Sequence, residues 1–171
     1  GAWVTRVVFV APDYSPGQPT FDYALLRYDE LRDGKTLGAT VGWFPVGLGR
    51  ATSGLDTVAV GYPIEGFFAA GCNGGGCYPW YCAAPPSNVA ADALGGGRAV
   101  GIGCVTAGGM SGGGVFAQVN GRWAVVSLVS VGPRFDATGR PCPTSDCYYG
   151  HNVIGPEFTA GYFDKLWDQA G

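Results

Sequence analysis

Short runs of apolar residues, separated by glycine, proline and small polar residues, extend along most of the chain. Runs of this length, rich in valine, leucine and aromatic residues, are typical of β-strands. Asn120-Gly121 separates two such runs and predicts a hairpin, because both turn residues tolerate a positive φ. The pattern predicts strands at residues 2–10, 22–28, 37–44, 57–62, 99–103, 115–119 and 122–131. Residues 71–97 and 132–150, rich in glycine, cysteine and proline, are expected to form long surface loops.

Near the end of the chain, the spacing of the hydrophobic residues changes from that of a strand to that of a helix. Tyr162, Phe163, Leu166 and Trp167 recur at helical spacing, which predicts one apolar helix face. Thr159 is a suitable N-cap, because its side-chain oxygen can accept a hydrogen bond from the first turn. The predicted fold class is therefore all-β with a single C-terminal helix.

Composition and charge exclude several classes of protein. The 171 residues carry a net charge of −3 and no basic patch, which argues against a nucleic-acid partner. No apolar stretch is long enough to span a membrane as a helix. A single histidine cannot complete the usual zinc-binding sets, so neither a metal nor another cofactor is implied.

The even number of cysteines, set in loop-like surroundings, favours disulfides and a secreted, extracytoplasmic protein. No signal peptide or initiator methionine is present, so we expect a mature product or a piece of a longer protein. The connectivity cannot be deduced from the sequence alone. Pairing of neighbours suggests Cys142–Cys147 and Cys72–Cys77, which leaves Cys82–Cys104.

The segment from Gly109 to Gly114 holds a serine, Ser111, among glycines that no ordinary strand requires. Such glycines let backbone N–H groups approach a ligand closely, as a nucleophile beside an oxyanion hole requires. One hypothesis is the nucleophile elbow of an α/β-hydrolase esterase, with Asp136 or Asp146 and His151 as partners. That elbow opens a helix, whereas consecutive glycines and a strand-like run follow Ser111.

Three segments together resemble chymotrypsin-like serine peptidases, and the pattern is closest to the bacterial V8-like, glutamyl-endopeptidase-type members. FDYALLRY, at residues 21–28, resembles the segment of the catalytic aspartate. GGMSGGGVF, at residues 108–116, resembles the nucleophile segment, and WAVVSLVSVG, at residues 123–132, resembles the strand beside the substrate cleft. The resemblance implies a trypsin-like double β-barrel and a serine endopeptidase acting on polypeptides.

The resemblance also implies a role for individual residues. Ser111 would be the nucleophile, the N–H groups of Gly109 and Ser111 would form the oxyanion hole, and Asp22 would orient a histidine. Val105 would lie near the floor of the specificity pocket, which then offers no acidic anchor. Val129 would replace the histidine of glutamyl-specific relatives, so glutamate specificity is not expected. The substrate backbone would pair with Ser130, Val131 and Gly132.

In this family the catalytic histidine precedes the aspartate, but His151, the chain's only histidine, follows Ser111. The resemblance therefore implies that the base lies upstream of Gly1, in an N-terminal fragment that completes the fold. Residues 1–33 would end the first β-barrel, residues 34–156 would form the second, and residues 157–171 the C-terminal helix. The parent protein would be a peptidase and the isolated chain inactive. The alternative is a catalytically inactive, peptidase-like binding module.

Overall fold

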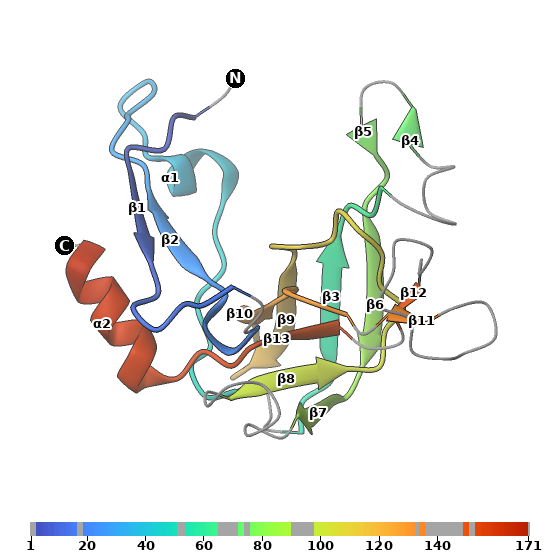
Figure 1. The fold of residues 1–171 in the computed structure, drawn as a ribbon. Coiled ribbons are helices and arrows are strands. Elements are labelled where there is room, and N and C mark those ends of the chain that lie inside the picture. Colours follow the sequence, from blue (N-terminus) through green and yellow to red (C-terminus); the bar gives the residue numbers. More distant parts are fainter. Residues whose placement is uncertain are drawn as a thin grey trace.

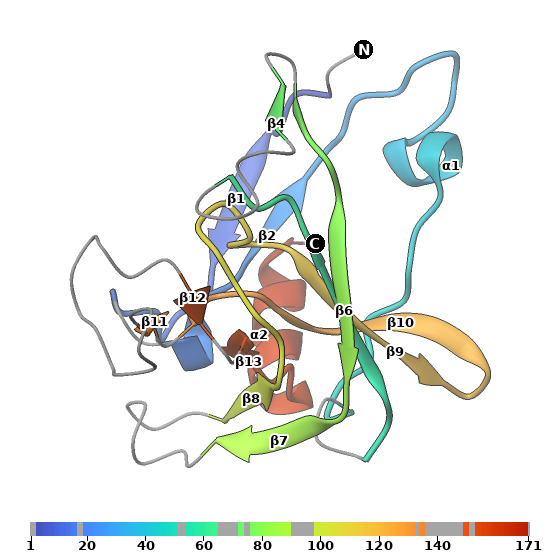
Figure 2. The same ribbon diagram turned by 90° about the vertical axis from the view of Figure 1, so that its right-hand side faces the viewer.

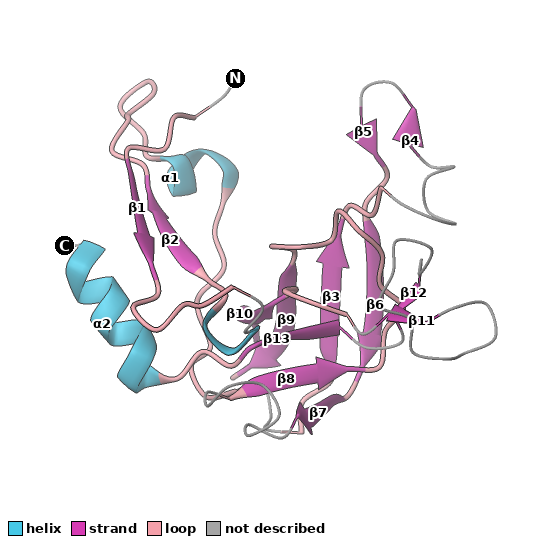
Figure 3. Ribbon diagram, in the orientation of Figure 1, coloured by secondary structure: helices cyan, strands magenta, loops and turns pink. Residues whose placement is uncertain are grey.

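The computed structural model describes residues 3–16, 19–50, 54–64, 72–73, 76–89, 98–132, 134–135, 149–150 and 153–170. Strands dominate the described part, and a helix ends it (Figure 1 and Figure 3). In chain order the elements are β1 (Val7–Val10), the 3₁₀ helix η1 (Pro19–Phe21), β2 (Ala24–Arg27), α1 (Leu37–Val41), β3 (Thr57–Gly61), β4 (Cys72–Asn73), β5 (Gly76–Cys77), β6 (Trp80–Ala84), β7 (Pro86–Val89), β8 (Ala99–Ile102), β9 (Gly114–Val119), β10 (Arg122–Leu128), β11 (Arg134–Phe135), β12 (Tyr149–Gly150), β13 (Val153–Pro156) and α2 (Ala160–Ala170).

Two antiparallel sheets enclose the main core. One has the strand order β10-β9-β3-β6 and the other the order β13-β8-β7. Small and branched side chains from both sheets fill the space between them, which keeps the strands closely packed. The buried cluster consists of Ala59, Val100, Ile102, Cys104, Met110, Val115, Ala117, Val126, Val129 and Val153.

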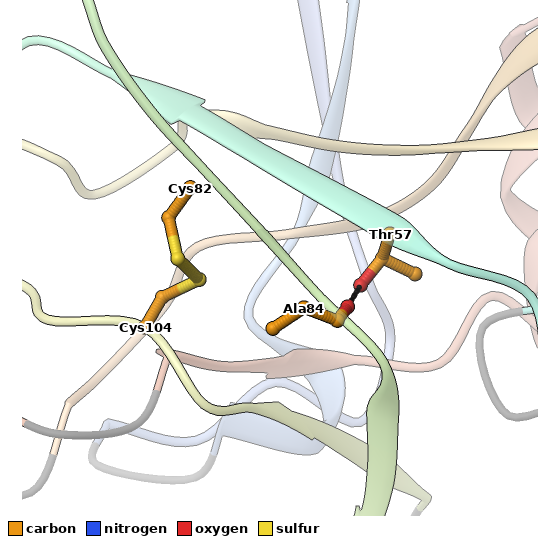
Figure 4. The surroundings of a disulfide bond; sticks show 4 residues. All are labelled: Thr57, Cys82, Ala84 and Cys104. Carbon is orange, nitrogen blue, oxygen red and sulfur yellow. Dashed lines mark hydrogen bonds between the residues drawn. A yellow bond between two sulfur atoms is a disulfide. The ribbon is translucent and has the colours of Figure 1, made fainter.

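A disulfide between Cys82 and Cys104 joins the two sheets (Figure 4). Cys82 lies in β6, and Cys104 follows β8 and belongs to the buried core. Next to the disulfide, the Thr57 hydroxyl donates a hydrogen bond of 2.7 Å to the Ala84 carbonyl, which ties β3 to β6. The predicted Cys82–Cys104 pairing is confirmed. This crosslink anchors the start of the segment that leads from β8 to Ser111.

A second, aromatic core lies between the β1–β2 hairpin and α2, which pack against each other in Figure 1. Tyr23 and Phe158 meet edge to face, with ring centroids 5.5 Å apart, a favourable arrangement for aromatic pairs. Arg27 donates a hydrogen bond of 2.9 Å to the Ala170 carbonyl at the end of α2. The helix therefore fixes the position of β2 and of the residues just before it.

Several sequence predictions are confirmed in detail. Asn120 and Gly121 have φ angles of 53° and 75° and join β9 to β10 in a tight hairpin, which Figure 2 shows clearly. Helix α2 begins directly after Thr159, as predicted, but in the described part of the chain it is the Thr159 carbonyl, not the side chain, that accepts the Phe163 N–H, at 2.9 Å. Its buried face is narrower than predicted, because only Phe163 and Leu166 of α2 are buried.

The prediction of a strand at residues 37–44 is wrong. Residues Leu37–Val41 form the short helix α1, so α2 is not the only helix. The Thr36 side chain accepts the Ala39 N–H at 3.2 Å, and Gly42, with a φ of +85°, ends the helix. This local capping outweighs the strand preference of the apolar residues, because the segment packs too little to benefit from that preference.

Residues 71–97 were predicted to be one long loop, which is also wrong. Strands β4 to β7 occupy much of it, and β6 alternates between half-buried and exposed side chains. This alternation is not evident in the sequence, because small alanine and cysteine side chains occupy most of the positions and give little contrast in hydrophobicity. Cys72 and Cys77 are register partners in the β4–β5 pair, but their side chains, like Cys142 and Cys147, lie outside the described residues.

Candidate active site

Residues 108–113, here called the Ser111 loop, run into β9 between the extensions of its two neighbouring strands. On one side, the Gly112 N–H donates to the Val129 carbonyl at 2.7 Å, and the Val129 N–H donates to the Gly113 carbonyl at 2.8 Å. On the other side, the Ile64 N–H donates to the Gly108 carbonyl at 2.8 Å. The loop is therefore held from both flanks although it belongs to no strand.

Met110 divides the Ser111 loop into a buried and an exposed part. Its side chain is 1% exposed and belongs to the main core, whereas Ser111 is exposed. Burial of the thioether anchors the loop and leaves the serine hydroxyl on the surface. The N–H groups of Gly109 and Ser111, on either side of Met110, donate no hydrogen bond within the described part of the chain. Unused backbone donors of this kind can bind an anionic oxygen.

Two glycines of the Ser111 loop have a positive φ, a backbone conformation that other residues rarely adopt. Gly109 has a φ of +92° and Gly112 a φ of +79°. A Cβ atom on Gly109 would lie 2.8 Å from both the Tyr62 carbonyl oxygen and Ile64 Cγ1, whereas one on Gly112 would meet nothing within 4 Å. Glycine at position 109 is therefore required by both conformation and space.

The two glycines give a matched pair of substitutions. We expect Gly112→Ala to lower the free energy of unfolding by about 1 to 2 kcal/mol, the cost of a left-handed backbone. Gly109→Ala adds the steric overlap and should cost about 2 to 5 kcal/mol in total. Urea unfolding of the two variants and the parent chain measures the difference. Equal losses would contradict the packing described at Gly109.

Asp22 and Ser130, 108 residues apart in the sequence, form a direct hydrogen bond. The Ser130 hydroxyl donates to Asp22 Oδ2 at 2.6 Å. Asp22 follows η1 and is itself exposed, but its neighbours Phe21 and Tyr23 are buried and hold the backbone in place. Sequence reasoning assigned Ser130 to the substrate backbone alone and missed this contact. Nothing in either local sequence indicates it, because the pairing depends on the tertiary fold.

The aromatic neighbour of Asp22 stays uncharged. Burial, and then the negative charge of Asp13, raise the pKa of Tyr23 above its ordinary value. Its ring packs against Phe158 and Phe163. Tyr23 therefore supports Asp22 by packing and adds no charge beside the carboxylate at neutral pH.

The backbone after β10 offers unused hydrogen-bonding groups. Val131 forms an antiparallel bridge with Ile154, with N···O distances of 3.0 and 2.7 Å. Alternate residues of an extended strand direct their hydrogen-bonding groups to opposite sides. The Ser130 N–H also donates to the Ile154 carbonyl, at 3.0 Å, but the Ser130 carbonyl and the Gly132 N–H bind no partner within the described residues. An extended peptide could pair with them.

The two valines named for specificity have different environments. Val105, directly after the disulfide-bonded Cys104, is 38% exposed. Val129 is 4% exposed and packs in the main core, where it contributes no polar group. Both side chains are apolar.

The α/β-hydrolase hypothesis is wrong, because strand β9 and not a helix follows Ser111. His151, Asp136 and Asp146 lie outside the described residues. Within the described ranges, no three histidine, cysteine or acidic residues gather as metal ligands do. The helices in these ranges are also too short or too polar to cross a membrane.

Comparisons with known proteins add one finding about the fold. No protein-family model matches the chain, and no curated protein matches its sequence. The solved structure of the protease Anisep from Arthrobacter nicotinovorans matches 99% of this chain and 67% of its own, with a TM-score of 0.73 and 21% identity. The thermostable serine protease AL20 from an extremophilic microorganism matches 99% of this chain and 68% of its own, with a TM-score of 0.70 and 24% identity.

The chain has the fold of these proteases. The predicted fold class, all-β with a C-terminal helix in the manner of chymotrypsin-like proteases, is thereby confirmed. The likeness extends over 99% of this chain and about two thirds of each of the two proteases.

Proposed function

We propose that this chain is part of a secreted serine endopeptidase that hydrolyses peptide bonds through an acyl-enzyme on Ser111. One observation carries the proposal. The consecutive residues Val129 and Ser130 bind both halves of the site, since Val129 accepts the Gly112 N–H at 2.7 Å and Ser130 donates to Asp22 at 2.6 Å. The same short segment is therefore hydrogen-bonded both to the predicted aspartate and to Gly112, the residue directly after the predicted nucleophile.

In the proposed reaction, Ser111 Oγ attacks the scissile carbonyl carbon while a histidine takes the hydroxyl proton. The negative oxygen that forms accepts hydrogen bonds from the N–H groups of Gly109 and Ser111. The C–N bond then breaks, and the leaving amine takes the proton from the histidine. Water, activated by the same histidine, hydrolyses the acyl-enzyme and restores Ser111.

Asp22 would orient that histidine and stabilise its charged form. Asp22 Oδ2 already accepts the Ser130 hydrogen bond, while Oδ1 has no hydrogen-bond partner among the described residues. An exposed carboxylate with one oxygen fixed and the other unused suits a residue that binds an imidazole N–H. Ser130 is then a positioning residue that acts through Asp22.

We propose that the histidine comes from a segment upstream of Gly1. The β1–β2 hairpin supports this, because it forms a two-stranded sheet whose side chains Val8, Val10 and Leu26 are each about half exposed. Isolated two-stranded sheets with apolar faces are unusual, since more strands are needed to bury such a face. An upstream segment would cover it. Residues 1–33 would then end the first barrel, residues 34–156 form the second, and residues 157–171 the C-terminal helix.

The substrate would bind as an added strand along Ser130, Val131 and Gly132, using the unused Ser130 carbonyl and Gly132 N–H. Val105, near the floor of the proposed specificity pocket, offers no charge for a basic side chain. The buried Val129 offers no group for an acidic one. We propose that the protein resembles the V8-like members in sequence pattern but lacks their preference for glutamate.

Trapping of the acyl-enzyme tests the proposed function. The full-length protein is mixed with a p-nitrophenyl ester of a blocked peptide and quenched in acid within milliseconds. We expect a burst of p-nitrophenol and a peptide carrying the acyl group on Ser111, identified by mass spectrometry. Absence of both would overturn the proposal and leave the catalytically inactive, peptidase-like binding module.

A further inference from the structure

The segment after β3, residues 62–64, lies against the Ser111 loop on the flank opposite Ser130. The sheet order β10-β9-β3-β6 requires this, because the loop extends β9 and its two neighbours are the extensions of β10 and β3. In Figure 1 the end of β3 and the start of β9 meet at the same upper end of the sheet. The Ile64 N–H donates to the Gly108 carbonyl at 2.8 Å and fixes the contact.

The backbone of this segment packs closely against the Ser111 loop, yet two of its large apolar side chains are exposed. Tyr62 is 57% exposed and Ile64 is 56% exposed, while Gly61 and Pro63 are buried. A Cβ atom on Gly61 would lie 3.2 Å from Met110 Cγ, so the backbone packs tightly against the buried part of the loop. Proline also restricts the backbone of its own residue and of Tyr62. Tyr62 and Ile64 therefore project outward from a fixed backbone.

A bound polypeptide must cross the Ser111 loop between these flanks. Its residues before the scissile bond would pair along residues 130–132, and its scissile carbonyl would lie at the Gly109 and Ser111 amides. The chain beyond the scissile bond then leaves on the side of residues 62–64, since the loop lies between the two extensions. Tyr62 and Ile64 are exposed, large apolar side chains on that side of the loop.

We infer that Tyr62 and Ile64 form a binding subsite for an apolar side chain in the first two residues after the scissile bond. The inference rests on the proposed function and adds a substrate preference to it. Burying a half-exposed aromatic or branched side chain against an apolar partner is favourable in proportion to the area removed from water. The protein should thus favour leaving portions that begin with leucine or phenylalanine over those that begin with glycine.

Acyl transfer isolates this subsite from the rest of catalysis. The full-length protein hydrolyses a p-nitrophenyl ester of a blocked peptide in the presence of leucinamide, phenylalaninamide or glycinamide, and the products of aminolysis and hydrolysis are separated. Both products come from the same acyl-enzyme, so their ratio does not depend on the rate of acylation. We expect aminolysis by leucinamide or phenylalaninamide to exceed that by glycinamide by about tenfold.

The variants Tyr62→Ser and Ile64→Ser should each reduce that preference several-fold, and the double variant should bring it close to one. Trp43→Ser, which removes another exposed large apolar side chain (75% exposed), is the matched control and should keep the preference. An acyl-enzyme that forms normally but shows no preference, or a preference that survives the double variant, would overturn the inference alone. Failure to form any acyl-enzyme would overturn it together with the proposed function.

Discussion

Ser111→Ala should abolish peptide hydrolysis by the full-length protein, with kcat reduced by about 10⁶-fold. The proposed mechanism has no second nucleophile, so only binding and the amide donors of the Ser111 loop would still assist water. The decrease should appear in kcat and leave KM little changed, because the serine hydroxyl acts on the reacting carbon. Steady-state kinetics with a peptide p-nitroanilide measures both constants.

The folding of this variant should be unaffected. Ser111 is exposed, and surface substitutions away from special backbone conformations usually change stability by about 0.5 kcal/mol or less. Urea unfolding of Ser111→Ala should therefore match the parent. A variant that folds normally and keeps more than a small fraction of the parent kcat would show that the nucleophile lies elsewhere.

Asp22→Asn should lower kcat by about 10⁴-fold in the full-length protein, because an amide would hold the histidine in the wrong tautomer. Ser130→Ala should have a much smaller effect, of about tenfold, since it removes one charge-assisted hydrogen bond to Asp22 and leaves the carboxylate in place. Steady-state kinetics of both variants and of their combination gives the order of the effects.

Asp56→Asn is the matched control for Asp22→Asn. Asp56 is also exposed, and it lies just before β3, at the end of that strand far from Tyr62 and the Ser111 loop. This control should keep the parent kcat. In the double variant, Ser130→Ala should add little to Asp22→Asn, because both changes act on the same carboxylate. Independent, multiplying effects would contradict the assignment of Ser130 as a residue that acts through Asp22.

The sequence predicted elements well where local chemistry decides the structure. Asn120-Gly121 favours one tight turn, so the β9–β10 hairpin follows from two residues and their apolar flanks. The prediction failed at residues 37–44, where the side chain of Thr36 caps a short helix in an otherwise apolar run. It also failed at β6, whose alternating pattern is carried by small residues that give little hydrophobic contrast.

The candidate site was predictable only in part. Ser111 and Gly109 could be predicted as site residues because clustered glycines are typical of a backbone that approaches a ligand or another chain segment closely. The contact of Ser130 with Asp22 and the placement of Tyr62 and Ile64 beside the loop could not. Both depend on which strands become neighbours. The order β10-β9-β3-β6 is set by packing between segments that are far apart in the sequence, so no single short segment predicts it.

In the proposed mechanism, Ser111 is a nucleophile whose histidine lies outside residues 1–171. A peptidyl phosphonate, which reacts with activated serines, tests both parts of this mechanism when labelling of the full-length protein and of the isolated chain is compared. We predict stoichiometric modification of Ser111 in the full-length protein and a rate lower by at least about 10³-fold in residues 1–171 alone, because the general base would be missing. Equally fast labelling of Ser111 in the isolated chain would contradict this mechanism.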